Sequence, residues 1–284
     1  MRKLFLLTLI SCLATAVFAA PKSDGAGKAM TYTIKYAKAK PEFKGDWEAY
    51  WNSAAWKQAS VANVDQWLKE SGANRPKTQA RVLYDETGLR ILWRVQDDPY
   101  VVCKAQKFMD RVSFDSCVEF FFEPAKEKGY LNLEANACGV YLWRAQTWPA
   151  GMDINTSYTA IKYRMWGKKE APPELGTKVQ VRKSLAQDSI ETPVTTPTTW
   201  YLELFFPAEL LEWSYGIKAA DLPGATWRGN FYKVMESKDP AAKEFVHFAS
   251  WSNLGGVANF HQPGKFGTLK FEKPKAGGKS PAKK

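Results

Sequence analysis

The sequence is poor in cysteine and histidine, with four and two of these among its 284 residues. Three of the cysteines, Cys103, Cys117 and Cys138, lie outside the N-terminal segment 1–20. This odd number permits at most one internal disulfide. Because Cys117 and Cys138 lie in apolar stretches, buried free thiols are an equal alternative. After residue 18 the sequence also lacks a run long and apolar enough to span a bilayer. We therefore expect a mature protein without a transmembrane segment, soluble or held at a surface.

The first twenty residues have the three-part pattern of a secretory signal peptide. Met1 to Lys3 carry positive charge, Leu4 to Phe18 is mainly apolar, and small residues follow at Ala19 and Ala20. We expect this signal peptide to be cleaved near those alanines and the protein to be secreted or periplasmic. A lipoprotein cleavage box ending at Cys12 is the alternative, although it leaves only a short apolar stretch ahead of the cysteine.

The formal net charge of +11 overstates the basicity of the folded part. Seven of the positive charges lie in the signal peptide or in the C-terminal segment 273–284, so the remainder carries about +4. That tail is rich in Lys, Pro, Gly and Ala, and we expect it to be disordered. It either contacts an anionic envelope component or polysaccharide, or is purely solubilising. A nearly balanced secreted domain is not expected to bind nucleic acid.

Between the two ends, short strands with alternating polarity dominate the sequence. Residues 21–39 are expected to form a polar leader with a first strand, and residues 40–272 one β-sandwich domain. Only residues 208–213 and parts of 61–70 look helical. The pattern predicts an all-β fold, an antiparallel sandwich or jelly roll with long loops between residues 143 and 197 and one or two short helices. The predicted strands are 32–36, 80–85, 89–97, 118–123, 130–136, 179–185, 200–206, 230–235, 245–250 and 266–271.

One predicted hairpin carries carboxylates where its strands should be most apolar. Pairing its strands around the loop 124–129 places Glu119 opposite Glu134. The alternation puts the large apolar residues of both strands on one face and Glu119, Glu134 and Asn136 on the other. Facing carboxylates repel each other, so the arrangement needs a cation or hydrogen-bond donors nearby. Arg94, on the polar face of a predicted neighbouring strand, is the candidate cation.

A sheet face with carboxylates, an amide and a guanidinium suits sugar hydroxyls, because each hydroxyl both donates and accepts a hydrogen bond. Aromatic rings bordering such a face supply apolar contact for the C–H faces of a sugar ring. A second interpretation is equally compatible with the sequence: Glu119 and Glu134 are ordinary solvated strand residues, balanced by Arg94 and lysines.

Several motifs, taken in order, resemble the family 9 carbohydrate-binding modules. They lie between Lys40 and Glu272 and include FKGDW, RVLYDETGLRI, DSCVEFF, YLNLEAN, SWS and NFHQPGKFGTLKF. The resemblance implies an antiparallel sandwich related to the DOMON superfamily. It also implies a non-catalytic role, in which the ends of glycan chains are bound between two aromatic rings, and structural metal ions, often calcium.

By position, the resemblance implies that Glu119 is the sugar-binding carboxylate. Phe260 takes the place of one clamping ring, and Phe114 would be the other, one residue out of phase because Cys117 adds a position. Family members can have a basic residue where this chain has Glu134, and both rings are Phe rather than Trp, which indicates a weaker or different ligand. The expected site for an oligo- or polysaccharide comprises Glu119, Glu134, Asn136, Arg94, Phe260, Phe114 and His261, the last as a ligand contact or a loop anchor.

Two other functions use the same residues. Glu119 and Glu134, about 5 Å apart at Cβ, are close enough for a retaining glycoside hydrolase, although nothing in the sequence specifies an acid with a raised pKa. A haem-binding, DOMON-type electron-transfer domain is the second, because some DOMON relatives are cytochromes with Met and His axial ligands, and His247 and His261 are the only histidines here. His247 alternates with apolar residues, which fits a structural role better than a haem ligand.

The sequence requires no cofactor, but Asp97 and Asp98 offer hard oxygen ligands for a structural calcium ion. The alternative is that these aspartates are ordinary turn residues. No enzyme domain is evident in the sequence, so a separate glycoside hydrolase or an envelope component is the expected protein partner.

Overall fold

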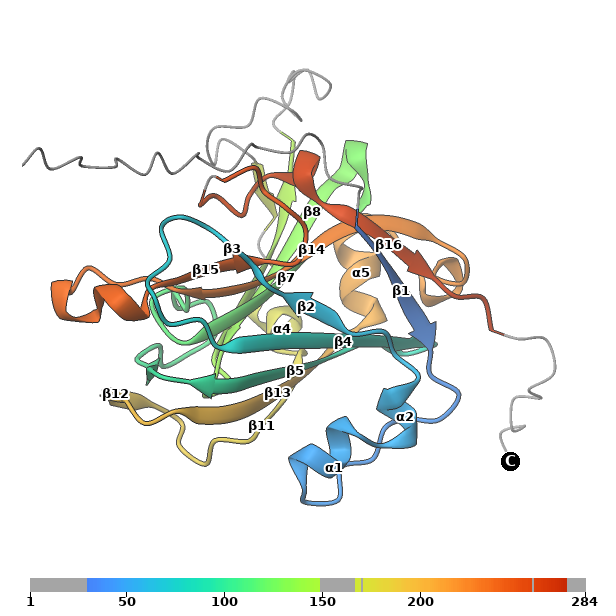
Figure 1. Ribbon diagram of the computed structural model, residues 1–284. Coiled ribbons are helices and arrows are strands. Elements are labelled where there is room, and N and C mark those ends of the chain that lie inside the picture. The colour runs from blue at the N-terminus through green and yellow to red at the C-terminus, as the bar shows by residue number, and fades with distance from the viewer. Residues whose placement is uncertain (1–29, 149–166, 170, 257, 275–284) are drawn as a thin grey trace, which may run out of the picture.

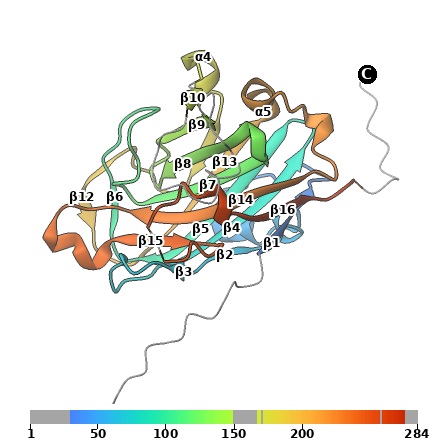
Figure 2. The same cartoon turned by 90° about the horizontal axis from the view of Figure 1, so that it is seen from above.

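The computed structural model describes residues 30–148, 167–169, 171–256 and 258–274, whose strands form two layers (Figure 1). The first layer contains, in spatial order, β10 (Gly167–Lys169), β9 (Tyr141–Thr147), β8 (Gly129–Asn136), β7 (Cys117–Ala125), β14 (Thr226–Met235) and β16 (Gly267–Phe271). The second contains β4 (Lys77–Asp85), β5 (Gly88–Asp98), β13 (Thr198–Pro207) and β11 (Gln180–Lys183). Figure 2 shows β7, β14 and β16 lying over β4 and β5. The predicted all-β sandwich is confirmed.

A single strand joins the two layers. The first half of β1 (Thr31–Tyr36) pairs with β16 and its second half with β4, and both pairings are parallel. The sequence prediction of a purely antiparallel sandwich is therefore wrong at this strand. The physical reason is that neither partner follows β1 through a tight hairpin: β16 is at the other end of the chain, and helices intervene before β4.

Shorter elements complete the sheets and their edges. β15 (His247–Ser250) extends the first layer beside β14 and pairs in turn with β3 (Gln66–Trp67), while β2 (Ala62–Val64) pairs with β4. β6 (Val101–Cys103) and β12 (Ile190–Val194) form a separate ribbon. The α-helices among the described residues are α1 (Trp47–Trp51), α2 (Ala54–Lys57), α4 (Pro173–Gly176) and α5 (Ala208–Tyr215), and 3-10 turns occupy Lys126–Lys128, Ala219–Asp221, Pro240–Phe245 and Pro263–Lys265. None of these helices is long and apolar enough to cross a membrane.

Two local predictions need correction. Part of segment 61–70 was expected to be helical, but it forms β2 and β3, because Ala62 and Val64 are buried on either side of exposed Asn63, a period of two. The region 143–197 was expected to hold long loops around the predicted strand 179–185, which is present as β11, but most of β9 and all of β10 and β12 lie there as well. In contrast, the predicted helix at residue 208 is present as α5, which ends at Gly216 in the left-handed conformation (φ 67°).

The main core fills the space between the layers. Trp93, Trp143 and Trp200 have no exposed surface, and Phe120 stacks on Phe231 with ring centroids 4.6 Å apart. Truncating an aromatic residue of this kind to alanine typically costs 3–5 kcal/mol. These inward-facing residues fix the strand registers, because a slip by one residue would turn each of them outward.

Apolar clusters also lie on the outer faces of both layers. On the second layer, Trp51 and Trp56 from α1 and α2 cover β4, β5 and β13. On the first layer, Phe121, Tyr232 and Phe260 belong to a cluster formed by β7, β8 and β14 together with two loops, residues 104–116 and 253–266. The loops are thereby held against the outer surface of the sheet, and the candidate site lies between them.

Candidate functional site

A cavity of about 490 Å³ opens on the outer face of the first layer. Strands β7, β8, β9, β14 and β15 supply its floor, and the loops 104–116 and 253–266 supply its walls. Its lining residues are Met109, Arg111, Ser113, Glu119, Tyr130, Asn132, Glu134, Leu142, Arg144, Gln146, Val234, Glu236, Phe248, Ala258, Asn259, Phe260 and His261. This volume lies within the range of small-ligand sites.

Glu119 and Glu134 meet in the floor of this cavity. They are directly opposite each other in the antiparallel pair β7–β8, as the sequence predicts, and both line the cavity. Only 4% of Glu119 and 8% of Glu134 is exposed, so both carboxylates are largely shielded from bulk water. The alternation that turns Phe120 and Leu133 into the main core turns the two glutamates outward.

Amides from β8 and β9 extend the polar part of the floor. Asn132 Nδ2 donates to Glu134 Oε1 at 2.7 Å, and Gln146 Nε2 donates to Asn132 Oδ1 at 2.8 Å. Arg144 is directly opposite Asn132 in the β8–β9 register. This row contains donors and acceptors in alternation, which is the requirement for binding several hydroxyl groups at once.

An aromatic wall stands beside the carboxylates. The Phe260 ring stacks on Tyr232 with centroids 4.1 Å apart and planes inclined by 10°, and Tyr232 donates from its hydroxyl to the Phe260 carbonyl at 3.0 Å. His261 Nδ1 shares a hydrogen bond with the Tyr130 hydroxyl and also lines the cavity. The structure thus places Phe260 and His261 in the cavity with Glu119.

The carboxylates and the burial shape the electrostatics of this region. Burial first, and then the charge of Glu119, raise the pKa of the Tyr232 hydroxyl well above its ordinary value. Burial followed by the charges of Glu119 and Glu134 does the same to the pKa of the Cys117 thiol. Both groups therefore stay neutral at physiological pH.

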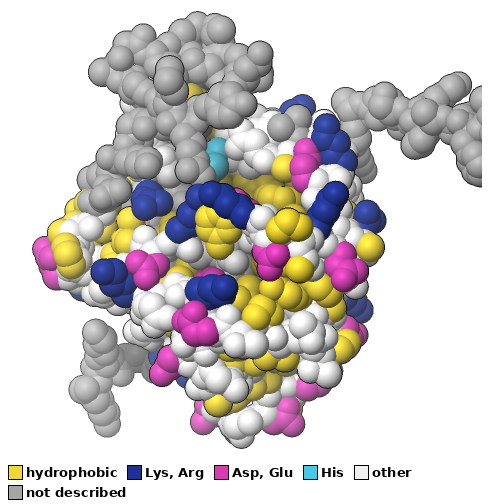
Figure 3. Space-filling model, turned by 90° about the vertical axis from the view of Figure 1, so that its left-hand side faces the viewer, with side chains coloured by type: hydrophobic (Ala, Val, Ile, Leu, Met, Phe, Trp, Pro, Cys, Tyr) yellow, Lys and Arg dark blue, Asp and Glu magenta, His cyan; other side chains and the backbone are white. Residues whose placement is uncertain are grey.

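The rim of the cavity is formed by an ion pair that the sequence did not predict. Arg111 Nη2 lies 2.9 Å from Glu236 Oε2, and Arg111 Nε donates to Ser113 Oγ at 3.0 Å. Phe114, predicted as the second clamping ring, is not among the lining residues. Instead the Arg111 guanidinium lies 4.2 Å from the centre of its ring, so Phe114 supports the rim from behind. Figure 3 shows a face of the molecule on which basic side chains border hydrophobic ones.

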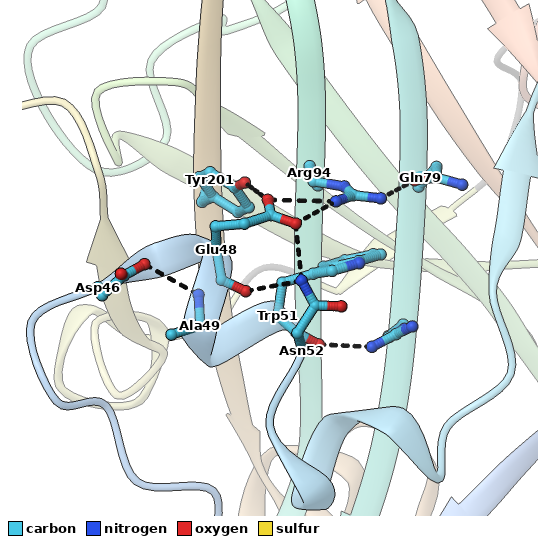
Figure 4. Close-up of polar contacts among 9 residues, drawn as sticks. Asp46, Glu48, Ala49, Trp51, Asn52, Gln79, Arg94 and Tyr201 are labelled. Carbon is cyan, nitrogen blue, oxygen red and sulfur yellow. Dashed lines mark hydrogen bonds and ion pairs between the residues drawn. The ribbon is translucent and has the colours of Figure 1, made fainter.

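Arg94 is not the cation beside the carboxylates, and this prediction is wrong. It lies on β5, in the other layer, and donates to Glu48 Oε1 at 2.9 Å and to Gln79 Oε1 at 2.7 Å (Figure 4). Its guanidinium lies 4.5 Å from the centre of the Trp51 ring. Because β5 pairs with β4 and β13, its outer face is the face covered by α1, on the opposite side of the sandwich from Glu119.

Asn136 shares the outward face of β8 with Glu134 but has a supporting role. It has no exposed surface, donates to Asp115 Oδ2 at 2.8 Å and accepts from the Val140 amide at 2.9 Å. Asp115 also accepts from the backbone amides of Lys104 and Ala105 at 2.8 and 3.0 Å. Asn136 therefore ties the start of the 104–116 loop to β8, and it does not line the cavity.

Asp97 and Asp98 do not share a site. Asp97 is exposed, whereas Asp98 is fully buried, lies 3.5 Å from Lys233 Nζ and accepts from Trp200 Nε1 at 3.0 Å. A buried lysine already neutralises Asp98, so the pair does not fit a calcium ion. Among the described residues, no group of three or more His, Cys, Asp or Glu side chains is arranged to hold a metal ion.

The remaining cysteines and histidines are placed as follows. Cys103, Cys117 and Cys138 are buried free thiols, so of the two alternatives open at the sequence level the structure has the unbridged one. His247 faces the interior, 3.2 Å from Lys233 Nζ through Nδ1, while His261 lies in the cavity on the outer face. The two histidines therefore lie on different faces of the first layer.

Most polar residues in the floor of the cavity were not predicted from the sequence. Arg144 and Gln146 lie on β9, whose sequence YLWRAQT alternates between core-facing and cavity-facing residues, and that alternation was a usable signal. Asn132 was visible on the predicted outward face of its strand. Arg111 and Asn259 come from loops, where no periodicity indicates the direction of a side chain.

Comparison with known proteins places this architecture in a family. The sequence profile described as Carbohydrate-binding family 9 matches residues 52–271. The chain belongs to carbohydrate-binding family 9. The match spans every strand of the candidate site, from β7 to β15.

Solved structures agree with this family 9 fold. A protein of Bacteroides uniformis that has been assigned a carbohydrate-binding role is 24% identical, with a TM-score of 0.66, over 86% of this chain and 100% of the other. A family 9 module of Caldicellulosiruptor kristjanssonii in complex with cellotriose is 12% identical, with a TM-score of 0.53, over 90% and 100%. The glucose complex of a family 9 module from that organism is 12% identical, with a TM-score of 0.51, over 87% and 98%. At this identity the likeness establishes the fold. No curated protein matches the chain significantly.

Proposed function

We propose that this family 9 protein binds a saccharide in the cavity on the outer face of the first layer and does so without catalysing a reaction. The observation that carries the proposal is the meeting of Glu119 and Glu134 in the floor of a cavity that also contains a stacked aromatic ring, Phe260. Largely desolvated carboxylates form strong, charge-assisted hydrogen bonds with hydroxyl donors. The ring supplies the apolar contact that a sugar C–H face requires.

The contacts around Glu134 suit the binding of hydroxyl groups. Asn132 donates a 2.7 Å hydrogen bond to Oε1 of Glu134. The amide of Gln146 in turn holds Asn132 in this orientation. The arrangement suits a carboxylate that receives hydrogen bonds from sugar hydroxyls.

Solved complexes of family 9 modules with cellotriose and glucose guide the choice of ligands to test. We propose gluco-configured and related oligosaccharides as the first candidates, taken up outside the cytoplasm in support of carbohydrate catabolism by a separate enzyme. The N-terminal signal pattern of residues 1–20 supports export.

A glycan array probed with the mature chain tests this proposal. We expect binding to a restricted set of oligosaccharides and no release of reducing sugar from any of them on prolonged incubation. Absence of binding across neutral, acidic and amino-sugar glycans would refute a saccharide site. Release of reducing sugar that disappears in Glu119→Gln would establish catalysis instead.

A further inference from the structure

The cavity has an apolar end next to its carboxylates. On β14, Val234 lies two residues after Tyr232, the residue that pairs with Glu119. Val234 itself pairs with Cys117 of β7 on one side and with Phe248 of β15 on the other. Val234 and Phe248 both line the cavity, and the Phe260 ring lies edge to face with Phe248 at 6.1 Å between centroids. A sugar hydroxyl pointing to this end would lose its hydrogen bonds to water without replacement.

A second apolar group lies on the β9 side of the cavity. Met109 lines the cavity together with Leu142, and the Met109 amide donates to the Tyr141 carbonyl at 3.1 Å. Met109 has a φ of 74°, a left-handed conformation that is uncommon for a residue other than glycine. Such strain persists where the surroundings enforce it, and it is concentrated at functional sites. Here the backbone hydrogen bond fixes Met109 beside β9, on the other side of the carboxylates from Phe248.

Hydrogen-bond donors lie at the rim of the cavity, beside the apolar end formed by Val234 and Phe248. The Glu236 amide donates to the Ser113 carbonyl at 2.8 Å. This hydrogen bond ties the loop 104–116 to the chain two residues after Val234. The Arg111 guanidinium is fixed there by Glu236 and by Phe114. A group that is apolar at its tip and has one acceptor oxygen near its base would match this combination.

We propose that the cavity selects sugars that carry an acetyl group, N- or O-linked, and this inference rests on the proposed saccharide site. The acetyl methyl group occupies the apolar end beside Val234 and Phe248. Its carbonyl oxygen accepts a hydrogen bond from Arg111 or Ser113 at the rim. The hydroxyls of the same sugar unit lie over Glu119 and the amides of β8 and β9.

Matched ligand pairs test the selectivity by calorimetric titration. One pair is a chito-oligosaccharide and the cello-oligosaccharide of equal length, which differ only in the acetamido groups. The other is acetylated xylan and the same xylan after alkaline deacetylation. Burial of a methyl group together with one additional hydrogen bond predicts that at least one acetylated member binds about tenfold more tightly. Equal affinities within both pairs, or a preference for the unacetylated members, would overturn the inference.

Two variants locate the selectivity. Phe248→Ala enlarges the apolar end, and Val234→Thr makes it polar with almost no change of shape, so a fold that tolerates only one of them still gives an answer. We expect the affinity ratio within the discriminating pair to fall towards one in either variant. Val194→Thr, on exposed β12 outside the cavity, is the matched control and should keep the wild-type ratio. A ratio unchanged in both cavity variants would contradict the assignment.

The outcomes also distinguish a failure of the acetyl pocket from a failure of the proposed saccharide site. Binding to oligosaccharides without a preference for acetylated members leaves the saccharide site standing and refutes the acetyl pocket alone. Absence of binding to every member of both pairs, together with a blank glycan array, refutes both.

Discussion

Glu119 and Glu134 face each other across β7 and β8 on the outer side of the first layer, each less than one-tenth exposed. Two buried carboxylates in direct opposition destabilise a strand pair unless donors stand close to them. Asn132 supplies one donor to Glu134 at 2.7 Å, and the cavity lined by the pair has room for others. The pair therefore offers two carboxylates in the floor of one cavity, as the proposed saccharide site requires.

The flat face of Phe260 should matter for binding more than its volume does. Phe260→Leu keeps the apolar contact with Tyr232 and should change the free energy of unfolding by less than about 1.5 kcal/mol. It removes the ring, and we expect saccharide affinity to fall about tenfold. Calorimetry and urea unfolding measure the two effects. Phe43→Leu, on the other layer, is the control and should leave the affinity unchanged.

Asp115 should be critical for stability because it ties the 104–116 loop to the sheet. Its carboxylate accepts hydrogen bonds from Lys104, Ala105 and Asn136. In Asp115→Asn an amide group must face at least one of these donors, and we expect a loss of about 2–4 kcal/mol in the free energy of unfolding. The exposed Asp188→Asn should leave the urea midpoint unchanged. Equal midpoints for the two variants would contradict the anchoring role.

The buried pair of Lys233 and Asp98 gives a third prediction. Both side chains have no exposed surface, and Lys233→Met leaves the Asp98 charge without its cation in the core. Removing one partner of such a pair typically costs 3–5 kcal/mol. Asp98→Asn keeps an acceptor for Trp200 Nε1, so the double variant should recover part of the loss. A double variant less stable than Lys233→Met would show that the charge is not the cause.

His247 should make stability depend on pH. Burial, and then the charge of Lys233, lower the pKa of His247 well below its ordinary value, so the folded protein keeps the ring neutral. Below pH about 6.5 the unfolded chain binds a proton that the folded chain does not, and stability falls as the pH falls. Between pH 7 and 5 the wild type should lose about 2 kcal/mol more than His247→Asn, whose amide oxygen can accept from Lys233. Parallel urea-derived stability profiles for the two proteins would refute this.

The hairpin register was predictable from sequence because it depends on local features, a short loop and the alternation on either side of Glu119. The position of Arg94 was not, because the sequence does not reveal which strands become neighbours: β7 lies between β8 and β14, and β14 comes a hundred residues later. Arg144 lines the cavity together with both carboxylates, and its strand β9 lies mostly in the region where long loops were expected. Chain order alone does not determine these long-range pairings, which depend on core packing.

Calorimetric titration of the best array ligand into Glu119→Gln and Glu134→Gln tests the central claim most directly. Each substitution preserves shape and removes one charge-assisted acceptor, so we predict a ten- to hundredfold loss of affinity in each. Glu48→Gln, on α1 at the opposite face, should bind as the wild type does. Wild-type affinity in both cavity variants would contradict a saccharide site built on the two facing carboxylates.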